Sequence, residues 1–279
     1  MDASKKSLFL TSRAFDRAVI TATTEVATLP VTNLQTQRPN RKYRANAKTY
    51  RVDIDLGAGR ETACNCAVVI GHNGTATATA EVKGGDSASE VNGVGAADLT
   101  SGVQSAWPPF GKPTEEDWPQ YSSLFLWDNE LNKRWWSLTW TDAANADNAE
   151  AGRVMIGRAF RPKFNISGNP LVGLMTTGVQ RRSGFNRIFT DPRGPVSRRI
   201  DVPINTLNER DMWDSLFEMQ RLLGLTEDFF FSANPAEEEY FHKWSGQFLF
   251  EDLNRFQANM QFDDYGRVWS TNFGLLELV

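Results

Sequence analysis

Two cysteines and one of the chain's two histidines lie close together, in "CNCAVVIGH" at residues 64–72. Cys64, Cys66 and His72 are ligands that zinc accepts, but a structural zinc site needs four, and the other histidine, His242, is far away in the sequence. In a regular strand Cys64 and Cys66 share one face, while the turn at "GHN" directs His72 elsewhere. We therefore expect no metal site here, and no base that would activate either thiol.

Two aspartates alternate with apolar residues in "RVDIDLG", at residues 51–57. Asp53 and Asp55 on one face could bind a cation or exchange a proton. The same alternation is typical of a half-buried strand whose carboxylates face water, and we favour that interpretation. The chain has no phosphate-binding glycine loop, no H-E-x-x-H and no G-x-S-x-G. The sequence thus predicts no enzyme, no catalytic residue, no cofactor and no metal.

Period-two patterns dominate the first 160 residues and predict strands at "RVDIDL", "CAVVIG", "TATATAEV", "WWSLTWT" and "GRVMIGRAF". The continuously apolar "CAVVIG" indicates a strand buried on both faces, next to "RVDIDL" in the same sandwich. Short strands separated by Gly, Asn and Asp clusters predict a mainly β fold whose first domain, residues 1–164, is an antiparallel β-sandwich of jelly-roll type.

The remainder, residues 165–279, is expected to be a second β-sandwich or barrel with one flanking helix. "LNERDMWDSLFEMQRLLG" predicts that helix over 208–223, with Asn208 as N-cap and Gly224 at its end. Met212, Leu216, Met219 and Leu223 form one apolar stripe at helical spacing. Strands are predicted at "RRIDVPI", "DFFFSA", "SGQFLFED" and "RVWSTNFGLLELV".

A proline-stiffened loop at residues 105–123 carries four aromatic residues. Aromatic rings stack on the apolar faces of sugars, so the loop is a candidate carbohydrate site. The alternative, which we favour, is that these rings close one end of the sandwich or contact a neighbouring subunit. The residues are Trp107, Phe110, Trp118 and Tyr121.

An arginine-rich segment spans residues 181–199, and carboxylates follow it in the same half of the chain. Arginines could bind phosphates, but bidentate pairing with carboxylates makes a subunit interface the preferred role. The candidate interface residues are Arg181, Arg182, Arg187, Arg198, Arg199, Glu237, Glu238 and Glu239.

Charge is unevenly distributed around the net value of −4. Residues 1–60 carry about +6 and residues 209–279 about −9, which suits head-to-tail contact between copies of one protein as well as an ordinary solvated surface. The first residues lack the apolar core of a signal peptide or membrane span, so we expect no membrane insertion. Two cysteines one residue apart imply no disulfide framework.

"LPVTNLQTQRPNRKYRA" followed by "YRVDIDLG" resembles the entry of a discoidin or galactose-binding-like jelly roll, with Tyr43 where tryptophan is usual. "VVIGHN", "RWWSLTWTD" and "AGRVMIGRAFRPKFN" resemble bacteriophage tail proteins in which such a domain precedes a second domain. "RRSGF", "SRRI", the helix and "LLELV" extend the similarity, although Phe185 stands where a second glycine is common.

The resemblance implies a minor structural protein at the distal end of a long, flexible phage tail, assembled in the bacterial cytoplasm. The second domain would be a β-sandwich of the tail-tube type that forms a ring with other copies, and DNA would pass through the lumen without specific binding. Other tail proteins would be its partners, and the jelly roll would project outward. The alternative function is attachment to host glycans through the aromatic loop 105–123.

Overall fold

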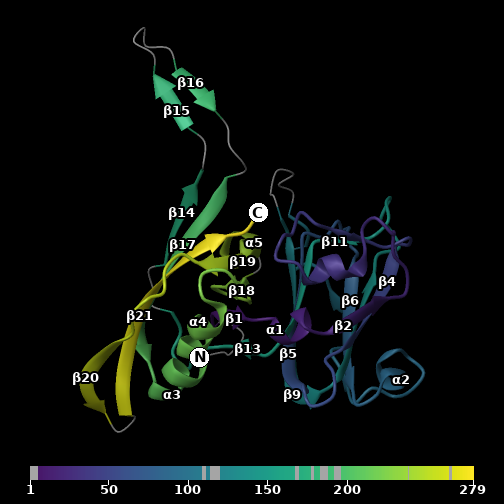
Figure 1. Cartoon of the computed structure of the whole chain (residues 1–279), viewed down its shortest axis with the longest axis horizontal. Helices are drawn as coiled ribbons and strands as arrows, with labels where there is room; N and C mark the ends of the chain where they lie inside the picture. The colour runs from purple at the N-terminus through teal and green to yellow at the C-terminus, as the bar shows by residue number, and fades with distance from the viewer. Residues whose placement is uncertain are drawn as a thin grey trace. The chain divides into compact units, whose positions relative to one another are not determined.

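A computed structural model describes residues 6–108, 111–113, 120–166, 170–176, 179–182, 188–191, 196–237, 239–263 and 266–279 (Figure 1). The chain divides into two compact units. The first unit holds Met1–Pro162 and Asp228–Gln247, and the second holds Lys163–Glu227 and Phe248–Val279. The sequence predicted one boundary, between residues 164 and 165. In the structure the chain instead passes from one unit to the other three times.

Two antiparallel sheets build the sandwich of the first unit. One has the order β2-β4-β10-β6-β7, with β8 also paired to β6, and the other has the order β12-β5-β9. The strands of the first sheet are β2 (Val19–Ala22), β4 (Thr49–Asp55), β6 (Thr79–Gly85), β7 (Leu99–Thr100), β8 (Gln104–Ser105) and β10 (Trp135–Thr141). Those of the second are β5 (Thr62–Ile70), β9 (Ser122–Lys133) and β12 (Arg153–Gly157). The predicted class, mainly β with antiparallel sheets, is confirmed.

The alternating patterns hold where these strands face the core. Trp136, Leu138 and Trp140 of β10 are buried, as are Val52 and Ile54 of β4. "TATATAEV" begins its strand later than predicted, at Thr79, because residues 75–78 form a turn closed by Ala78 N donating to Thr75 O. The strands β4 and β5 are successive strands of one sandwich, but they lie in different sheets rather than side by side.

Strand β5 is buried on both faces, as its continuous apolar run predicts. Ala67 and Val69 belong to the core between the two sheets, while Val68 and Ile70 belong to a second apolar cluster. That second cluster includes Phe230 and Phe241, which come from Asp228–Gln247. The outer face of β5 is therefore covered by a segment that follows it by more than 150 residues.

A register shift in the β5–β9 pair corrects the expectation that Cys64 and Cys66 face the same way. Cys64 pairs with Leu131 and Cys66 with Leu126, so the ladder is interrupted between them. As a result Cys64 lies in the core between the sheets and Cys66 in the cluster on the other face. A bulge breaks the period-two rule on which the expectation rested.

The segment Asp228–Gln247, which returns to the first unit, is held there by strand pairing and by polar contacts. The strand β1 (Leu8–Leu10) pairs with β13 (Ala159–Phe160) and with β18 (Phe229–Ser232), and β18 is followed by α5 (Phe241–Trp244) and β19 (Ser245–Phe250). The smaller elements of this unit are α1 (Arg13–Asp16), η2 (Val31–Gln35), β3 (Tyr43–Arg44), α2 (Ala88–Val91) and β11 (Glu150–Ala151).

In the second unit, β17 (Ser197–Leu207) and β21 (Gly266–Glu277) form a long antiparallel pair. The strand β14 (Leu171–Met175) adds to β17, while the Phe248–Phe250 part of β19 and β20 (Gln257–Asp263) add to β21. A separate hairpin consists of β15 (Val179–Arg182) and β16 (Ile188–Asp191). In Figure 1 the hairpin of β15 and β16 lies beyond β14, and β20 lies toward the other end of this unit.

One helical run of 15 residues, 209–223, follows β17 as predicted. It comprises α3 (Glu209–Asp211), a π-helical segment η3 (Met212–Phe217) and α4 (Glu218–Leu223). Asp211 N donates to Asn208 Oδ1 at 2.6 Å, and Gly224 ends the run at a φ of 56°. The predicted apolar stripe is buried. No helix in the part of the chain that the structure describes is long and apolar enough to cross a membrane.

Candidate functional site

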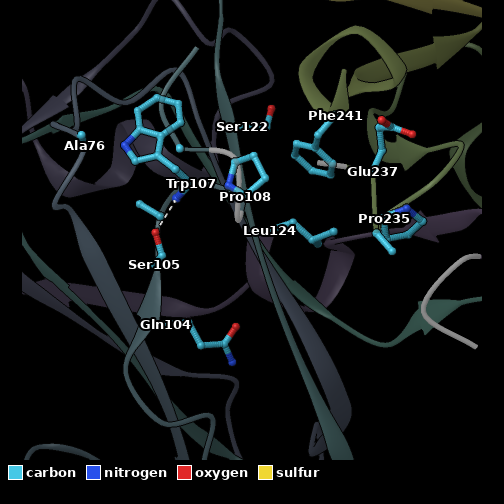
Figure 2. A pocket seen from close by; sticks show the side chains of 13 residues that line it. Ala76, Gln104, Ser105, Trp107, Pro108, Ser122, Leu124, Pro235, Glu237 and Phe241 are labelled. Carbon is cyan, nitrogen blue, oxygen red and sulfur yellow. Dashed lines mark hydrogen bonds between the residues drawn. The ribbon is translucent and has the colours of Figure 1, made fainter. Parts of the chain in front are cut away.

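A groove of about 650 Å³ opens in the first unit, between the chain around β8 and the segment that returns from the second half of the sequence (Figure 2). Gln104, Trp107 and Pro108 come from one side, Pro235, Glu237 and Phe241 from the other, and Ser122 and Leu124 from β9. Because residues 235–241 belong to the first unit, both sides of the groove are parts of one compact body.

The polar groups of the groove are acceptors and hydroxyls. The side-chain amide of Gln104 donates to Ser101 O at 3.1 Å and to Leu126 O at 2.9 Å, which leaves its carbonyl oxygen as an acceptor. Glu237 accepts from Asn234 Nδ2 at 3.3 Å and has no ion pair with another described residue. None of the described residues that line the groove is cationic. The lining therefore suits a ligand that donates hydrogen bonds or carries positive charge.

Trp107 is a wall of this groove rather than an exposed platform, because only 5% of the residue is accessible. Its Nε1 donates to Thr75 O at 2.6 Å. Its ring lies 4.9 Å from that of His72 and 5.4 Å from that of Tyr121, and Lys112 Nζ lies 5.6 Å from the ring centre. With these neighbours the indole belongs to the apolar core of the first unit.

The other residues of the aromatic loop divide between described and undescribed parts of the chain. Tyr121 is half-buried and lies between Trp107 and His242, whose ring is 5.9 Å away. Phe110 and Trp118 lie outside the described residues. The structure therefore brings Trp107 and Tyr121 together.

His72 packs against Trp107, one of the residues that line the groove, in a setting that does not make it a base. Gly74 N donates to His72 Nδ1 at 3.2 Å, so Nε2 carries the proton and donates to Ser123 Oγ at 2.7 Å, and Ser123 Oγ donates in turn to Ala106 O. Burial, with a smaller contribution from Lys112, lowers the pKa of His72 to about 3. The imidazole is therefore a neutral hydrogen-bonding group. Because its Nδ1 already accepts from Gly74 N and its Nε2 carries a proton, it cannot take up the hydroxyl proton of Ser123.

Cys64 and Cys66 are buried thiols, and Asp53 and Asp55 each form an ion pair with an arginine. Burial raises the pKa of both Cys64 and Cys66. Asp53 pairs with Arg51 at 2.8 Å, and Asp55 pairs with Arg134 at 2.6 Å. Among the described residues, no three His, Cys, Asp or Glu side chains lie close enough together to hold a metal ion.

The arginines and glutamates predicted to form a subunit interface are spread over both units. Arg198 is buried, forms an ion pair with Glu277 and lies over the ring of Phe248, so its guanidinium serves the interior of the second unit. Arg199 is half-exposed and pairs with Glu251 at 2.8 Å.

Of the glutamates predicted to pair with these arginines, Glu237 lines the groove and Glu239 accepts a hydrogen bond from Tyr240. Arg187 and Glu238 lie outside the described residues, as do the side chains of Arg181 and Arg182. No pair between the arginine-rich segment and residues 237–239 is present among the described residues.

Sequence reasoning missed the strand β14, whose five residues are all exposed. The signal was available in "LVGLM", which is an apolar run of five residues without a charge. Such a run is typical either of a central strand or of an exposed edge strand that can pair with another chain. Only the strand pairing in the structure distinguishes the two.

No family model and no curated protein sequence matches the chain. Solved structures show a distant likeness. A fucosidase of Ruminococcus gnavus in complex with fucose is 13% identical, over 54% of this chain and 27% of its own length, with a TM-score of 0.41. A family 32 carbohydrate-binding module from Clostridium perfringens NanJ in complex with galactose is 11% identical, over 55% of this chain and 99% of its own, with a TM-score of 0.36.

A third structure, of XRCC1 bound to the catalytic domain of DNA polymerase β, is 18% identical over 54% of this chain and 98% of its own, with a TM-score of 0.37. This chain therefore spans about a quarter of the fucosidase and nearly all of the other two. At these identities and TM-scores the likeness carries no conclusion about ligand, partner or activity.

Proposed function

We propose that the protein is a structural subunit of a bacteriophage tail tip, in which copies of the second unit form a ring around the DNA channel and the first unit is peripheral. Its action would be assembly rather than catalysis. The sequence resemblance to phage tail proteins supports this proposal, and so does the opposite charge of the two ends of the chain.

One observation carries the proposal: exposed apolar side chains are concentrated in the second unit. That unit holds about a third of the chain, yet it contains eleven of the fifteen large apolar side chains that are exposed among the described residues. Monomeric proteins seldom leave contiguous apolar patches in water, whereas subunit interfaces need them. The eleven are Phe164, Leu171, Val172, Leu174, Met175, Val196, Trp213, Phe217, Leu222, Leu225 and Leu253.

The mass of the purified protein tests this function. Light scattering after size exclusion should give a multiple of the 31.3 kDa chain mass, and negative-stain images should show closed rings. The protein should also be detected by mass spectrometry in purified virions. A monodisperse monomer that is absent from virions would exclude the proposal.

A second candidate function is attachment to host glycans, which the groove favours. Its acceptors and hydroxyls lie among the apolar surfaces of Phe241, Pro108 and Pro235, a combination that suits a sugar. A glycan array should detect binding by the parent protein. Glu237→Gln should weaken binding about tenfold, since it removes a charged acceptor. Glu239→Gln, outside the lining, should not. No binding by the parent protein would exclude this candidate.

A further inference from the structure

The strand β14 is an exposed edge without the usual protection. It pairs with β17 on one side, and no described strand pairs with its other side. Its sequence, Leu-Val-Gly-Leu-Met, contains no charge and no proline. Such an edge presents unpaired main-chain groups beside apolar side chains, which is the condition under which another chain adds a strand.

Several other edges in the described part of the chain are short or covered. The strands β7, β8 and β13 have two residues each. The first part of β9 lies beside Gln104, which donates to Leu126 O, and its second part carries Asp128, Glu130 and Lys133. Among the strands whose side chains are all described, β14 is the one in which every residue is exposed.

The exposed face of β14 continues a buried face of its neighbour. In the antiparallel register Val172 lies opposite Ile200 and Leu174 opposite Arg198, so each pair points to the same side of the sheet. Ile200 and Arg198 are buried, whereas Val172 is 45% and Leu174 is 75% exposed. The interior of the second unit therefore ends at β17, and its apolar surface continues one strand further into solvent.

Beyond β21 the same sheet divides, because the Phe248–Phe250 part of β19 pairs with one end of β21 and β20 pairs with the other end, and no described strand pairs with the far side of β20. The strand β20 pairs with β21, and β21 pairs with β17 through the opposite edge. Gln257 and Ala258, at the start of β20, are exposed. A sheet with two different open edges joins head to tail, and a head-to-tail contact closes into a ring when the rotation allows.

We propose that β14 of one copy adds to β20 of the next copy, so that the sheets of neighbouring second units become continuous; this inference rests on the proposed ring function. The occupant of the exposed edge is thus a second copy of this chain. Val172 and Leu174 become covered by side chains of the added strand, and the main-chain groups of both edges gain hydrogen bonds.

Cysteine cross-linking tests this join on the full-length chain. Leu174→Cys and Gln257→Cys are prepared separately, mixed, and treated with a short bis-maleimide. The native Cys64 and Cys66 are buried, so the unsubstituted protein supplies a blank. The mixture should yield a covalent dimer that neither variant forms alone. Val94→Cys, exposed in the first unit, replaces Leu174→Cys in the control mixture and should yield none.

Assembly of charged variants provides the second measurement. Leu174→Lys should weaken self-association by about tenfold or more, while Val94→Lys should leave it unchanged. A cross-link formed by Leu174→Cys alone would overturn the head-to-tail join. Rings that persist in Leu174→Lys without any 174–257 cross-link would overturn this inference and leave the ring function standing. A protein that never assembles would overturn the ring function itself.

Discussion

Arg153 and Asp228 form a buried ion pair across 75 positions of sequence. The guanidinium binds the carboxylate through two bonds, of 3.1 Å from Nε and 3.0 Å from Nη2, and it also binds Asp16. Gln247 Nε2 donates to the same carboxylate of Asp228 at 2.6 Å. This contact fixes the first residue of the returning segment to the sandwich, and so it supports one side of the groove.

Arg153→Met should lower the free energy of unfolding by about 3–5 kcal/mol, because it leaves Asp228 buried without a cation. Urea titration followed by fluorescence measures the change. Arg221→Met, which breaks an exposed pair with Glu218, is the matched control and should leave the free energy of unfolding almost unchanged, because water screens that pair. The double variant Arg153→Met, Asp228→Leu should recover part of the loss. Equal losses in Arg153→Met and Arg221→Met would contradict this account.

His72 makes the stability of the first unit depend on acidity. Its pKa is about 3 in the folded protein and about 6.5 in an unfolded chain, so between these values the unfolded chain binds the extra proton. The stabilisation is complete above pH 6.5. It falls by about 1.4 kcal/mol for each pH unit of acidification below that value, until the folded histidine titrates near pH 3.

The measurement compares the parent protein with His72→Gln over a pH series of urea titrations. Asp16, whose pKa is raised by burial, acts in the opposite direction but is present in both proteins. The difference in unfolding free energy between them should therefore shrink steadily from pH 6.5 downward. A difference that stays constant with pH would show that His72 is accessible to protons in the folded state.

Trp107 should contribute to stability whether or not the groove has a ligand. Trp107→Ala should cost about 3–5 kcal/mol because it leaves a cavity beside His72. Trp107→Phe should cost about 1 kcal/mol, for the lost bond to Thr75 O. Thermal unfolding checks both, with Val94→Ala as an exposed control. An unchanged melting temperature in Trp107→Ala, together with lost saccharide binding, would instead identify an exposed stacking platform.

The helix of the second unit depends on its N-cap. Asn208→Ala removes the acceptor for Asp211 N and should destabilise the second unit by about 1 kcal/mol. Asn208→Asp retains an acceptor at the positive end of the helix and should be nearly neutral. Chemical denaturation followed by far-ultraviolet circular dichroism distinguishes the two. Equal stability of the alanine and aspartate variants would argue against this cap.

Local patterns predicted the elements that depend on local physics. The alternation of Trp136, Leu138 and Trp140 identified β10, and Asn208 with Gly224 fixed the ends of the helix. The double-sided burial of β5 was also evident from its unbroken apolar run. In each case a residue is buried because of its position along a strand or helix, and the sequence immediately around it is enough to predict that position.

Features that join distant segments were not accessible in this way. Period-two spacing places Cys64 and Cys66 on one face, but the opposing strand β9 introduces the shift that separates them. Arg153 gives no indication that its partner is Asp228. The groove needs residues 104–108 beside residues 235–241, and these come together through contacts between distant segments, such as the pairing of β18 with β1.

The three passages of the chain between its two units have a consequence for synthesis. While residues 1–162 emerge from the ribosome, β1 has no β18 to pair with, and Phe9 and the outer face of β5 lack their cover. The N-terminal sandwich can complete its packing only after residue 247 has been translated, and by then the residues of the helix in the second unit, 209–223, have been translated too. Folding of the two units is therefore coupled in time, and a nascent chain truncated near residue 162 should be a substrate for chaperones rather than a finished domain.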